Sequence, residues 1–354
     1  MMQTRHPHLI ACVNVGATGR SVLPPGRTYI GSVSDDPYDI RTRVVVTRRP
    51  GAFSFVGTDL VSVDPSVSDP EYMTMVRGAP SRGINEEGLS FTWTLALEKG
   101  ENQPPQNAMG PAELWGHILE ECSTVAEAID RLTTLPRGFA ANGMLADREG
   151  DLAAVEFGRK RLTVRQKYSL SEGGTATNVN CWIRMQEEEG DPLVSLDNPA
   201  VPNKLRYERA EELLAKMNGR INLEAMRQIL TDHVNRERSA GENPWIPGHG
   251  YSICNHGSLR TTRFEREKAG CGSVSAEIID PMAGVFWYAY GWPCGEPAVY
   301  GDELLQEKSW GTFVGFPLAD LPAGEYTTLS GELTALACRH FVLLRSWSSA
   351  VDDS

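Results

Sequence analysis

The sequence predicts a single α+β domain in which helices are layered against antiparallel sheets. Its 354 residues include 34 glycines and 22 prolines. Both shares are somewhat above the usual ~7% and ~5%, which favours short strands joined by many turns. The predicted elements follow the order β-rich segment, two helices, strands, two helices, strands. Neither an internal repeat nor a low-complexity linker interrupts this order, so we expect one domain.

The first half of the chain is predicted to be mostly β-structure. Clusters of Gly, Pro, Asp and Ser, such as Leu23–Gly26 and Asp35–Pro37, separate short apolar or alternating runs. These runs predict strands at Leu9–Val15, Thr28–Val33, Arg43–Thr47, Ala52–Val56 and Leu89–Leu97.

Two helices are predicted next. The first covers Pro111–Cys122. The second begins at a capping box of Thr124 and Glu127 and ends before Pro136. Within it, apolar residues recur at the spacing of a helix face, at Val125, Ala128, Ile129 and Leu132.

The second half alternates between strands and helices. A polar turn at Arg148–Asp151 joins two apolar runs and predicts a hairpin that includes Leu152–Phe157, and Arg161–Gln166 adds a strand. Two helices are expected at Asn203–Met217 and Leu223–Val234, with Gly219 as a C-terminal cap and Asn222 as an N-cap. The remaining predictions are strands at Tyr251–Cys254, Ser273–Ile279 and Gly284–Tyr290, and a closing helix at Glu332–Leu344.

Charge and hydropathy exclude several classes of function. The formal net charge is −12, and an acidic surface argues against binding to nucleic acid or to an anionic membrane. No apolar run approaches the ~18–20 residues of a membrane span, and the N-terminus lacks the apolar stretch of a secretory signal. We therefore expect a soluble, cytoplasmic protein whose partners are small molecules.

The cysteines indicate neither a disulfide framework nor a zinc-finger pattern. There are 7 cysteines, an odd number, and none forms a CxxC pair. We expect most of them to be buried thiols in a reducing compartment. A metal set of His249, Cys254 and His256 is an alternative, but local hydrogen bonding explains these residues better, so we expect no metal and no cofactor.

Cys12 has two interpretations. It is either a buried core residue or a catalytic nucleophile. It lies in a predicted strand near the N-terminus, and Asp35 follows about twenty residues later at the end of the next strand. Removal of residues 1–11 would expose the Cys12 α-amino group, whose pKa is ordinarily about 7.7–8.0. Such an amine takes the proton from its own thiol, and Asp35 could orient it.

Short motifs follow one another in a consistent order over roughly residues 9–300 and carry a resemblance. They are Gly83–Leu89, Leu145–Gly150 with Val155–Glu156, Thr177–Asn178, Leu230–His233, Ser252–His256 and Gly291–Cys294. The series resembles that of the acyl-coenzyme A:6-aminopenicillanic-acid acyltransferase-like family of cysteine N-terminal-nucleophile hydrolases. Choloylglycine hydrolases, penicillin V acylases and acid-ceramidase-like amidases are more distant cousins.

The resemblance implies a four-layer αββα sandwich and a reaction at an amide bond of a small molecule. By position, Cys12 matches the nucleophile and Asp35 matches the acid of a Gly-Arg-Asn-x-Asp motif. Asn178 matches the residue that holds the oxyanion or the amine of the nucleophile. The resemblance further implies that residues 1–11 are a self-cleaved propeptide and that residues 12–354 form one catalytic domain. It is compatible with a homo-oligomer.

One departure from the family pattern supports a second hypothesis. Where the family has Arg-Asn before the motif's acid, this chain has Ser32-Val33, and Val13 follows Cys12 where a small polar residue is usual. Either another arginine replaces the missing one, for which Arg27 is a candidate, or the site is altered. The alternative function is therefore a catalytically inactive relative that serves as a binding or scaffold protein.

Overall fold

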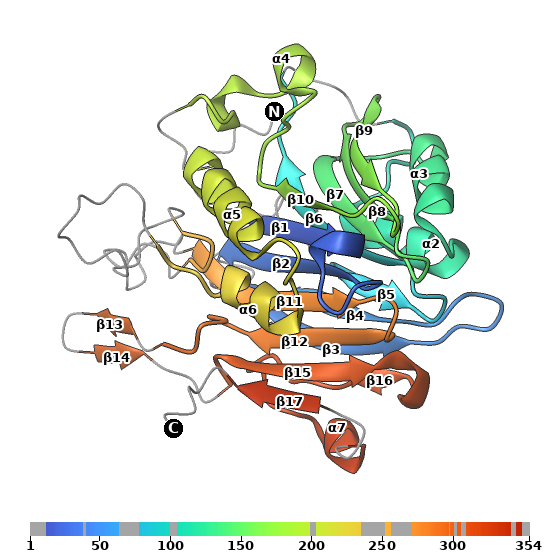
Figure 1. Cartoon of the computed structure of the whole chain (residues 1–354). Coiled ribbons are helices and arrows are strands. Elements are labelled where there is room, and N and C mark those ends of the chain that lie inside the picture. The colour runs from blue at the N-terminus through green and yellow to red at the C-terminus, as the bar shows by residue number, and fades with distance from the viewer. Residues whose placement is uncertain are drawn as a thin grey trace.

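The computed structural model describes residues 12–37, 40–63, 78–99, 105–198, 203–234, 252–255, 271–296, 298–300, 303–305, 309–340 and 345–348. In this part of the chain, two large antiparallel sheets dominate (Figure 1). One has seven strands in the order β10 (Gly174–Asn178), β1 (Val13–Thr18), β2 (Thr28–Pro37), β11 (Cys271–Asp280), β12 (Val285–Tyr290), β15 (Thr312–Pro317) and β17 (Arg345–Ser348).

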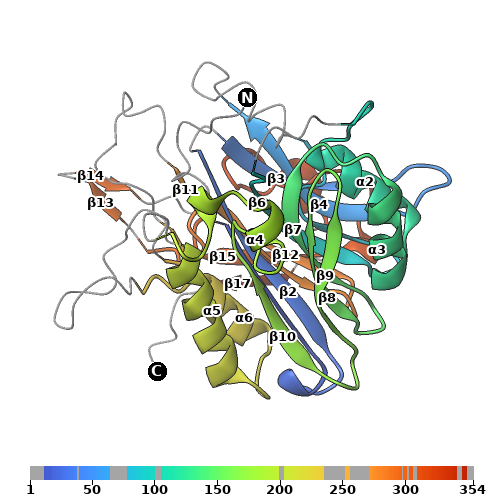
Figure 2. The same ribbon diagram turned by 90° about the horizontal axis from the view of Figure 1, so that it is seen from above.

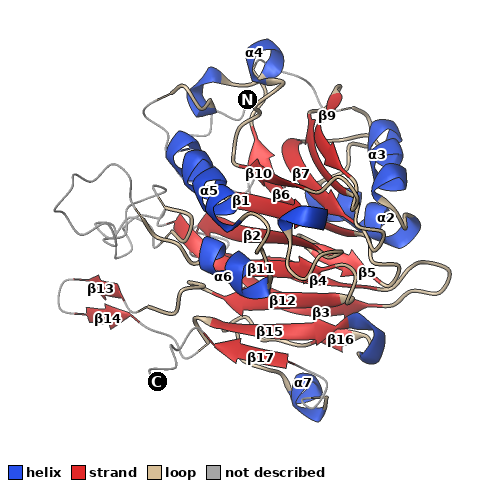
Figure 3. Cartoon of the chain, viewed as in Figure 1, coloured by secondary structure: helices blue, strands red, loops and turns tan. Residues whose placement is uncertain are grey.

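The other large sheet has eight strands. Their order is β16 (Gly324–Glu325), β3 (Ile40–Thr47), β4 (Phe55–Ser62), β5 (Gly83–Asn85), β6 (Ser90–Ala96), β7 (Ala140–Ala146), β8 (Leu152–Phe157) and β9 (Leu162–Tyr168). A separate two-stranded ribbon pairs β13 (Ala298–Tyr300) with β14 (Glu303–Leu305). Strands therefore outnumber helices along the described chain, as Figure 3 makes visible.

Three apolar cores show that the two sheets are stacked between two layers of helices. The first core packs α5 (Asn203–Met217) and α6 (Leu223–Leu230) against the seven-stranded sheet. The second packs α2 (Pro111–Glu121) and α3 (Val125–Thr134) against the eight-stranded sheet. The third lies between the sheets. Figure 2 shows the helix pairs on opposite sides. The arrangement is the αββα sandwich of N-terminal-nucleophile hydrolases, which confirms the expected fold.

The helix signals in the sequence act locally as expected. The Thr124 side chain accepts a hydrogen bond from the Glu127 backbone at the start of α3. Asn222 does the same for Ala225 at the start of α6. Gly219 follows α5 with a φ of +77°, a left-handed backbone that favours glycine at a helix end. These caps satisfy backbone donors and acceptors that helix ends leave open.

Alternation along the strands places a polar row between the two sheets. Asn14 pairs with Asn178 on one side and with Ser32 on the other, and Ser32 pairs in turn with Glu277. All four residues are at most 2% exposed. The residues next to them in sequence, Val13, Val33 and Ala276, belong instead to the core that faces α5 and α6. Because side chains alternate across a strand, the row faces the eight-stranded sheet.

Three predicted elements differ in the structure. The closing helix predicted at Glu332–Leu344 is only α7 (Ala335–Arg339), because Leu333 is taken up in a β-bridge with Thr327 and Thr334 caps the helix after it. Residues 252–254 form a bend rather than a strand, while Tyr251 lies outside the described residues. Helix α6 ends at Leu230, four residues before the predicted end.

The remaining features of the fold concern membrane association and the position of β10. No helix among the described residues has the length and apolar character needed to cross a membrane. The short helix α4 (Gln186–Glu189) follows β10 after a loop. Strand β10 lies at the edge of its sheet, next to β1.

Candidate active site

Cys12 lies immediately before β1 and is 6% exposed. Its nearest recorded partner is the backbone of Asp35 on the neighbouring strand β2. The Asp35 N–H donates to Cys12 Sγ at 3.4 Å, and the thiol donates to the Asp35 carbonyl at 3.5 Å. The register of β1 with β2, in which Val13 pairs with Val33, brings these two residues together. The structure thus places the Cys12 thiol beside the backbone of Asp35.

The surroundings of the Cys12 thiol keep it protonated at neutral pH. Burial, and after it the nearby carboxylate of Asp36, raise the pKa of the thiol to about 12. Arg82 acts in the opposite direction and lowers this pKa. A thiol in this state is a poor nucleophile, since only the thiolate attacks readily. This description applies to the chain in which residue 12 still has its peptide bond to Ala11, which lies outside the described residues.

The carboxyl group of Asp35 has its own set of partners. It accepts hydrogen bonds from Ser273 Oγ at 2.7 Å and from Asn255 Nδ2 at 3.0 Å. Burial raises the pKa of Asp35 to about 7, and the guanidinium of Arg206 is the largest influence that lowers it. Asp35 therefore contacts Cys12 through its backbone, while its side chain is held by β11 and by the segment that contains Asn255.

Asn178 lies in β10, opposite Asn14 and therefore close to the start of β1 in the register. Its Oδ1 accepts a hydrogen bond from Arg165 Nη2 at 2.7 Å, and its Nδ2 donates to the Gly143 carbonyl at 3.2 Å. Both ends of the amide are thus engaged. The amide nitrogen carries a second N–H, and this is the group that could donate to an oxyanion.

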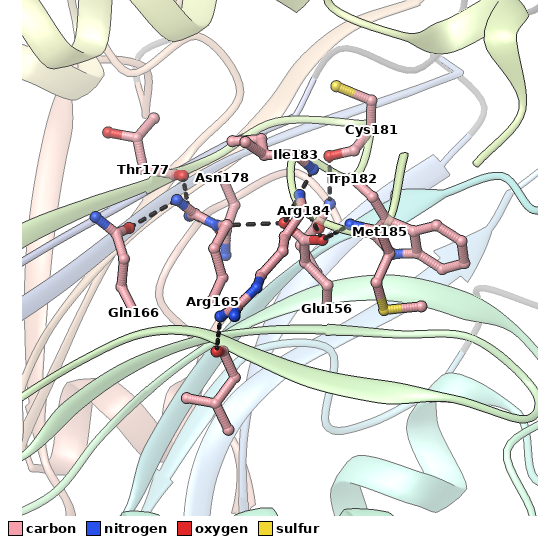
Figure 4. Close-up of polar contacts among 12 residues, drawn as sticks. Glu156, Arg165, Gln166, Thr177, Asn178, Cys181, Trp182, Ile183, Arg184 and Met185 are labelled. Atoms are coloured by element: carbon pink, nitrogen blue, oxygen red, sulfur yellow. Dashed lines mark hydrogen bonds and ion pairs between the residues drawn. The ribbon is translucent and has the colours of Figure 1, made fainter. Parts of the chain in front are cut away.

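Figure 4 shows how Arg165 links Asn178 to Glu156. Arg165 Nε lies 3.3 Å from Glu156 Oε1. The Glu156 carboxylate also accepts hydrogen bonds from three successive backbone N–H groups, those of Ile183, Arg184 and Met185. Glu156 belongs to one of the family-like motifs, and its contacts show that it anchors the chain after β10.

Two other motif residues also have structural roles in the described chain. Asp147 accepts hydrogen bonds from the backbones of Val125, Glu149 and Asp151, so it closes the β7–β8 turn and joins it to α3. Asn85 donates to the carbonyls at the end of α2 and accepts from the Leu89 backbone, as expected of a turn residue.

Arg82 was not identified from the sequence, yet it contacts the residue that replaces the family's arginine. It precedes β5 in the opposite sheet, and its side chain is 3% exposed. Its Nε donates to Ser32 Oγ at 3.3 Å and lies 3.9 Å from Glu277 Oε2. Its Cζ lies 5.6 Å from the centre of the Trp93 ring. A buried cation therefore reaches Ser32 from the residue that precedes β5 in the opposite sheet.

Arg206 is the second arginine that the sequence did not reveal. It lies in α5, is fully buried, and its Nη1 donates to the Cys12 carbonyl at 3.2 Å. Asn203 accepts a hydrogen bond from its Nη2. Since the chain between residues 12 and 206 contains three strands of the seven-stranded sheet and seven strands of the eight-stranded sheet, no local sequence signal connects them. Arg206 fixes the backbone of Cys12 from the helix side.

Arg27, the candidate replacement proposed from the sequence, lies elsewhere. It precedes β2, where Thr28 pairs with Thr18, at the opposite end of the β1–β2 pair from Cys12. Arg27 Nη1 lies 3.4 Å from a carboxylate oxygen of Asp280, with the Arg27 side chain 38% exposed. Arg27 therefore does not replace the arginine that is missing at position 32.

The alternative metal set of His249, Cys254 and His256 includes two residues, His249 and His256, that lie outside the described residues.

The buried carboxyl of Glu277 makes stability depend on pH. Burial raises its pKa from 4.5 to about 7. Between these values the unfolded chain has ionised and the folded chain has not, so the free energy of unfolding falls as pH rises from about 4.5 to 7. Removing the group by Glu277→Gln should therefore stabilise the variant relative to the parent across this window. The gain should reach about 3 kcal/mol above pH 7.

Urea unfolding of both proteins at several pH values measures this difference. Both proteins share every other titrating group, so the difference between their pH curves isolates Glu277. Parallel curves between pH 4.5 and 7 would show that Glu277 is ionised in the folded protein throughout, paired with Arg82.

A comparison with sequence families gives an independent result. The profile described as acyl-coenzyme A:6-aminopenicillanic acid acyl-transferase matches residues 42–247, more than half of the chain. The chain belongs to this acyl-transferase family. The match contains Asn178, Arg82 and Arg206 but begins after Cys12 and Asp35. The roles of these last two residues in the acyl-transferase fold therefore rest on the local geometry.

Solved structures with this fold include enzymes that act on amides. A variant of conjugated bile acid hydrolase from Clostridium perfringens has a TM-score of 0.47 and 11% identity, covering 95% of this chain and 97% of that one. Penicillin V acylase from Agrobacterium tumefaciens has a TM-score of 0.43 and 12% identity, covering 86% and 91%.

An N-acylethanolamine-hydrolyzing acid amidase orthologue from Caenorhabditis elegans has a TM-score of 0.41 and 13% identity, covering 77% of this chain and 93% of that one. A search of curated proteins found no match to this member of the acyl-transferase family.

Proposed function

We propose that this protein cleaves or transfers the acyl group of a small-molecule amide, with Cys12 as the nucleophile. The observation that carries the proposal is the environment of Cys12, whose thiol adjoins Asp35 on β2 and whose carbonyl is held by Arg206. Arg82 adds a buried cation whose field lowers the pKa of this thiol. Membership of the acyl-transferase family supports the reaction class.

The first proposed step activates the nucleophile. The Cys12 sulfur attacks the Ala11 carbonyl carbon and the C–N bond breaks, which frees the Cys12 α-amino group and leaves residues 1–11 attached as a thioester. Water then hydrolyses the thioester, so residues 1–11 leave as a carboxylic acid and the thiol is restored. This amine, with a pKa ordinarily near ~8, is close enough within the same residue to accept the thiol proton. The thiol of the uncut chain, with its pKa of about 12, lacks this base.

The second step forms and resolves an acyl-enzyme. The Cys12 sulfur attacks the amide carbon, the C–N bond breaks, and the leaving amine takes the proton held by the α-amino group. Water or a second amine then attacks the thioester and restores the thiol. Asn178 Nδ2 is the proposed donor to the oxyanion, a contribution typically worth about 10²–10³ in rate.

Intact mass spectrometry tests this proposal. The purified protein should give a species that begins at Cys12. After incubation with a panel of N-acyl amino acids, penicillins and short peptides, a fraction should gain the mass of one acyl group at Cys12. A chain that keeps residues 1–11 and gains no adduct would contradict the proposal.

The alternative function, a non-catalytic binding or scaffold protein, has one observation in its favour. In the uncut chain, Cys12 is buried and its pKa is about 12, so it should react slowly with electrophiles. If the thiol remains slow to react with electrophiles after residues 1–11 are removed, the scaffold hypothesis is favoured.

None of the six cysteines with described side chains forms a disulfide, which is compatible with the proposed reducing, cytoplasmic location.

A further inference from the structure

A second cluster of reactive side chains lies apart from Cys12, where three distant segments of the chain meet. His233 follows α6, Cys254 belongs to the segment 252–255, and Cys294 lies in the turn after β12. The ligand atoms of these residues all lie within 4.8 Å of one another. His233 is 1% exposed and Cys254 is fully buried, while Cys294 is half-buried.

We propose that His233, Cys254 and Cys294 bind one zinc ion. Two thiolates and one imidazole are a donor set that zinc prefers, and a Cys₂His set leaves a fourth position for water or a carboxylate. Ideal Zn–S and Zn–N bonds of about 2.3 and 2.0–2.1 Å place tetrahedral ligand atoms about 3.5–3.8 Å apart. A contraction of about 1 Å from the observed limit of 4.8 Å would complete the site.

The charges of the cluster match a divalent cation. The sulfurs of Cys254 and Cys294 lie within 4.8 Å of each other, and Cys254 is fully buried. Two sulfurs at close range in a buried site cannot both ionise without a counter-charge. One Zn²⁺ would neutralise both thiolates. The Glu296 carboxylate, 4.0 Å from His233 Nδ1, lies where a fourth ligand or a counter-ion is needed.

The backbone around the cluster is also arranged to stabilise thiolates. The Glu296 N–H donates to Cys294 Sγ at 3.4 Å, and a backbone hydrogen bond from Cys294 lowers the pKa of Cys254. Such N–H···S contacts favour the charged form of sulfur. The Cys254 N–H donates to the Asp232 carbonyl at 2.9 Å, and the Asp232 carboxylate is held in turn by Arg209.

The proposed ion would anchor the segment that holds Asp35. Asn255, the residue after Cys254, donates to the Asp35 carboxyl at 3.0 Å, and its backbone N–H donates to Ser273 Oγ at 2.9 Å. Ser273 is the other recorded donor to Asp35. The metal site would therefore have a structural role. It would hold the hydrogen-bond donors of Asp35 in place without contacting the reacting atoms. The proposal departs from the sequence expectation of no metal.

Metal analysis of the full-length protein, purified without chelators, tests the inference. We expect about one zinc ion per chain, and below about 0.1 in Cys294→Ala and in His233→Gln. Cys338→Ala is the matched control, since it removes an exposed thiol in α7 and should keep the full zinc content. Cobalt exchange should give a sulfur-to-metal charge-transfer band in the parent that weakens in Cys294→Ala.

Chelation provides the second measurement. Removing the metal should lower the melting temperature, and adding zinc should restore it. A parent that binds no zinc on titration, or whose Cys254 and Cys294 are joined in a disulfide and so two hydrogen atoms lighter, would overturn the inference. Equal zinc in folded Cys294→Ala and parent would do the same. These readouts use neither substrate nor cleavage before Cys12, so they fail or succeed independently of the proposed function.

Discussion

Cys12→Ala should leave residues 1–11 attached to the chain and should lower amidase activity at least ~10³-fold. The sulfur is proposed both to cut the preceding peptide bond and to carry the acyl group, so its loss removes both steps. The variant should fold, because replacing the thiol group by a hydrogen atom in a site with two weak sulfur hydrogen bonds removes little packing. Intact mass and the kcat/KM for the best substrate measure the two effects.

Cys122→Ala is the matched control for this experiment. Cys122 is also buried, at 4% exposure, but it caps α2 in the core on the other side of the eight-stranded sheet. Its replacement should cost some stability and leave both processing and activity intact. If folded Cys12→Ala is processed or active like Cys122→Ala, Cys12 is not the nucleophile.

Arg82→Met should slow the alkylation of Cys12 in the processed enzyme by about 10-fold or more at a fixed pH. A neighbouring cation lowers a thiol pKa by about 1–3 units, so its removal leaves less thiolate. The pH profile of iodoacetamide labelling should therefore move upward. The change also removes Arg82 from beside the buried carboxyl of Glu277. This carboxyl, with a pKa of about 7, can become neutral by taking up a proton, so the variant need not bury an unpaired charge.

Two further variants separate the charge of Arg82 from its packing. Arg137→Met removes an arginine that is equally buried, at 4% exposure, but donates to the Gly158 carbonyl in the other core. It should lower stability without moving the labelling profile of Cys12. Arg82→Lys retains a cation and should keep most of the reactivity. A folded Arg82→Met protein with the parent's profile would show that Arg82 does not activate the thiol.

Ser32→Arg alone would not restore the family pattern usefully. Ser32 is fully buried and its Oγ already lies 3.3 Å from Arg82 Nε, so a second guanidinium would have no room there and would face a like charge. We expect this single variant to be strongly destabilised. Combining it with Arg82→Ser should recover part of the stability, since one cation then serves the same space. Urea unfolding of the single and double variants measures the difference.

Local signals in the sequence predicted the helical layers well. Thr124 and Asn222 cap α3 and α6 as expected, because a side chain that satisfies a nearby backbone donor needs no tertiary partner. The closing helix predicted at Glu332–Leu344 begins later, at Ala335, because Leu333 pairs with Thr327. It ends at Arg339, and residues 341–344 lie outside the described residues. A β-bridge of this kind depends on which segments meet in space, and apolar spacing alone does not contain that information.

The residues of the candidate site also differ in how far the sequence could predict their positions. Cys12 and Asp35 belong to consecutive strands that pair antiparallel, so their proximity follows from a short loop and a register. Asn178 was predicted only through the resemblance, and its amide is engaged by Arg165 and by the Gly143 carbonyl. Neither partner is adjacent to it in sequence.

By itself, the sequence determined the alternation of strands and helices, the caps that start the helices, and the closeness of Cys12 to Asp35. These depend on residues a few positions apart or on one strand pair, where local geometry dominates. Only the tertiary structure decided which cations reach Cys12. Arg82 arrives from the opposite sheet and Arg206 from α5, because stacking two sheets between helices brings buried side chains together from distant parts of the chain.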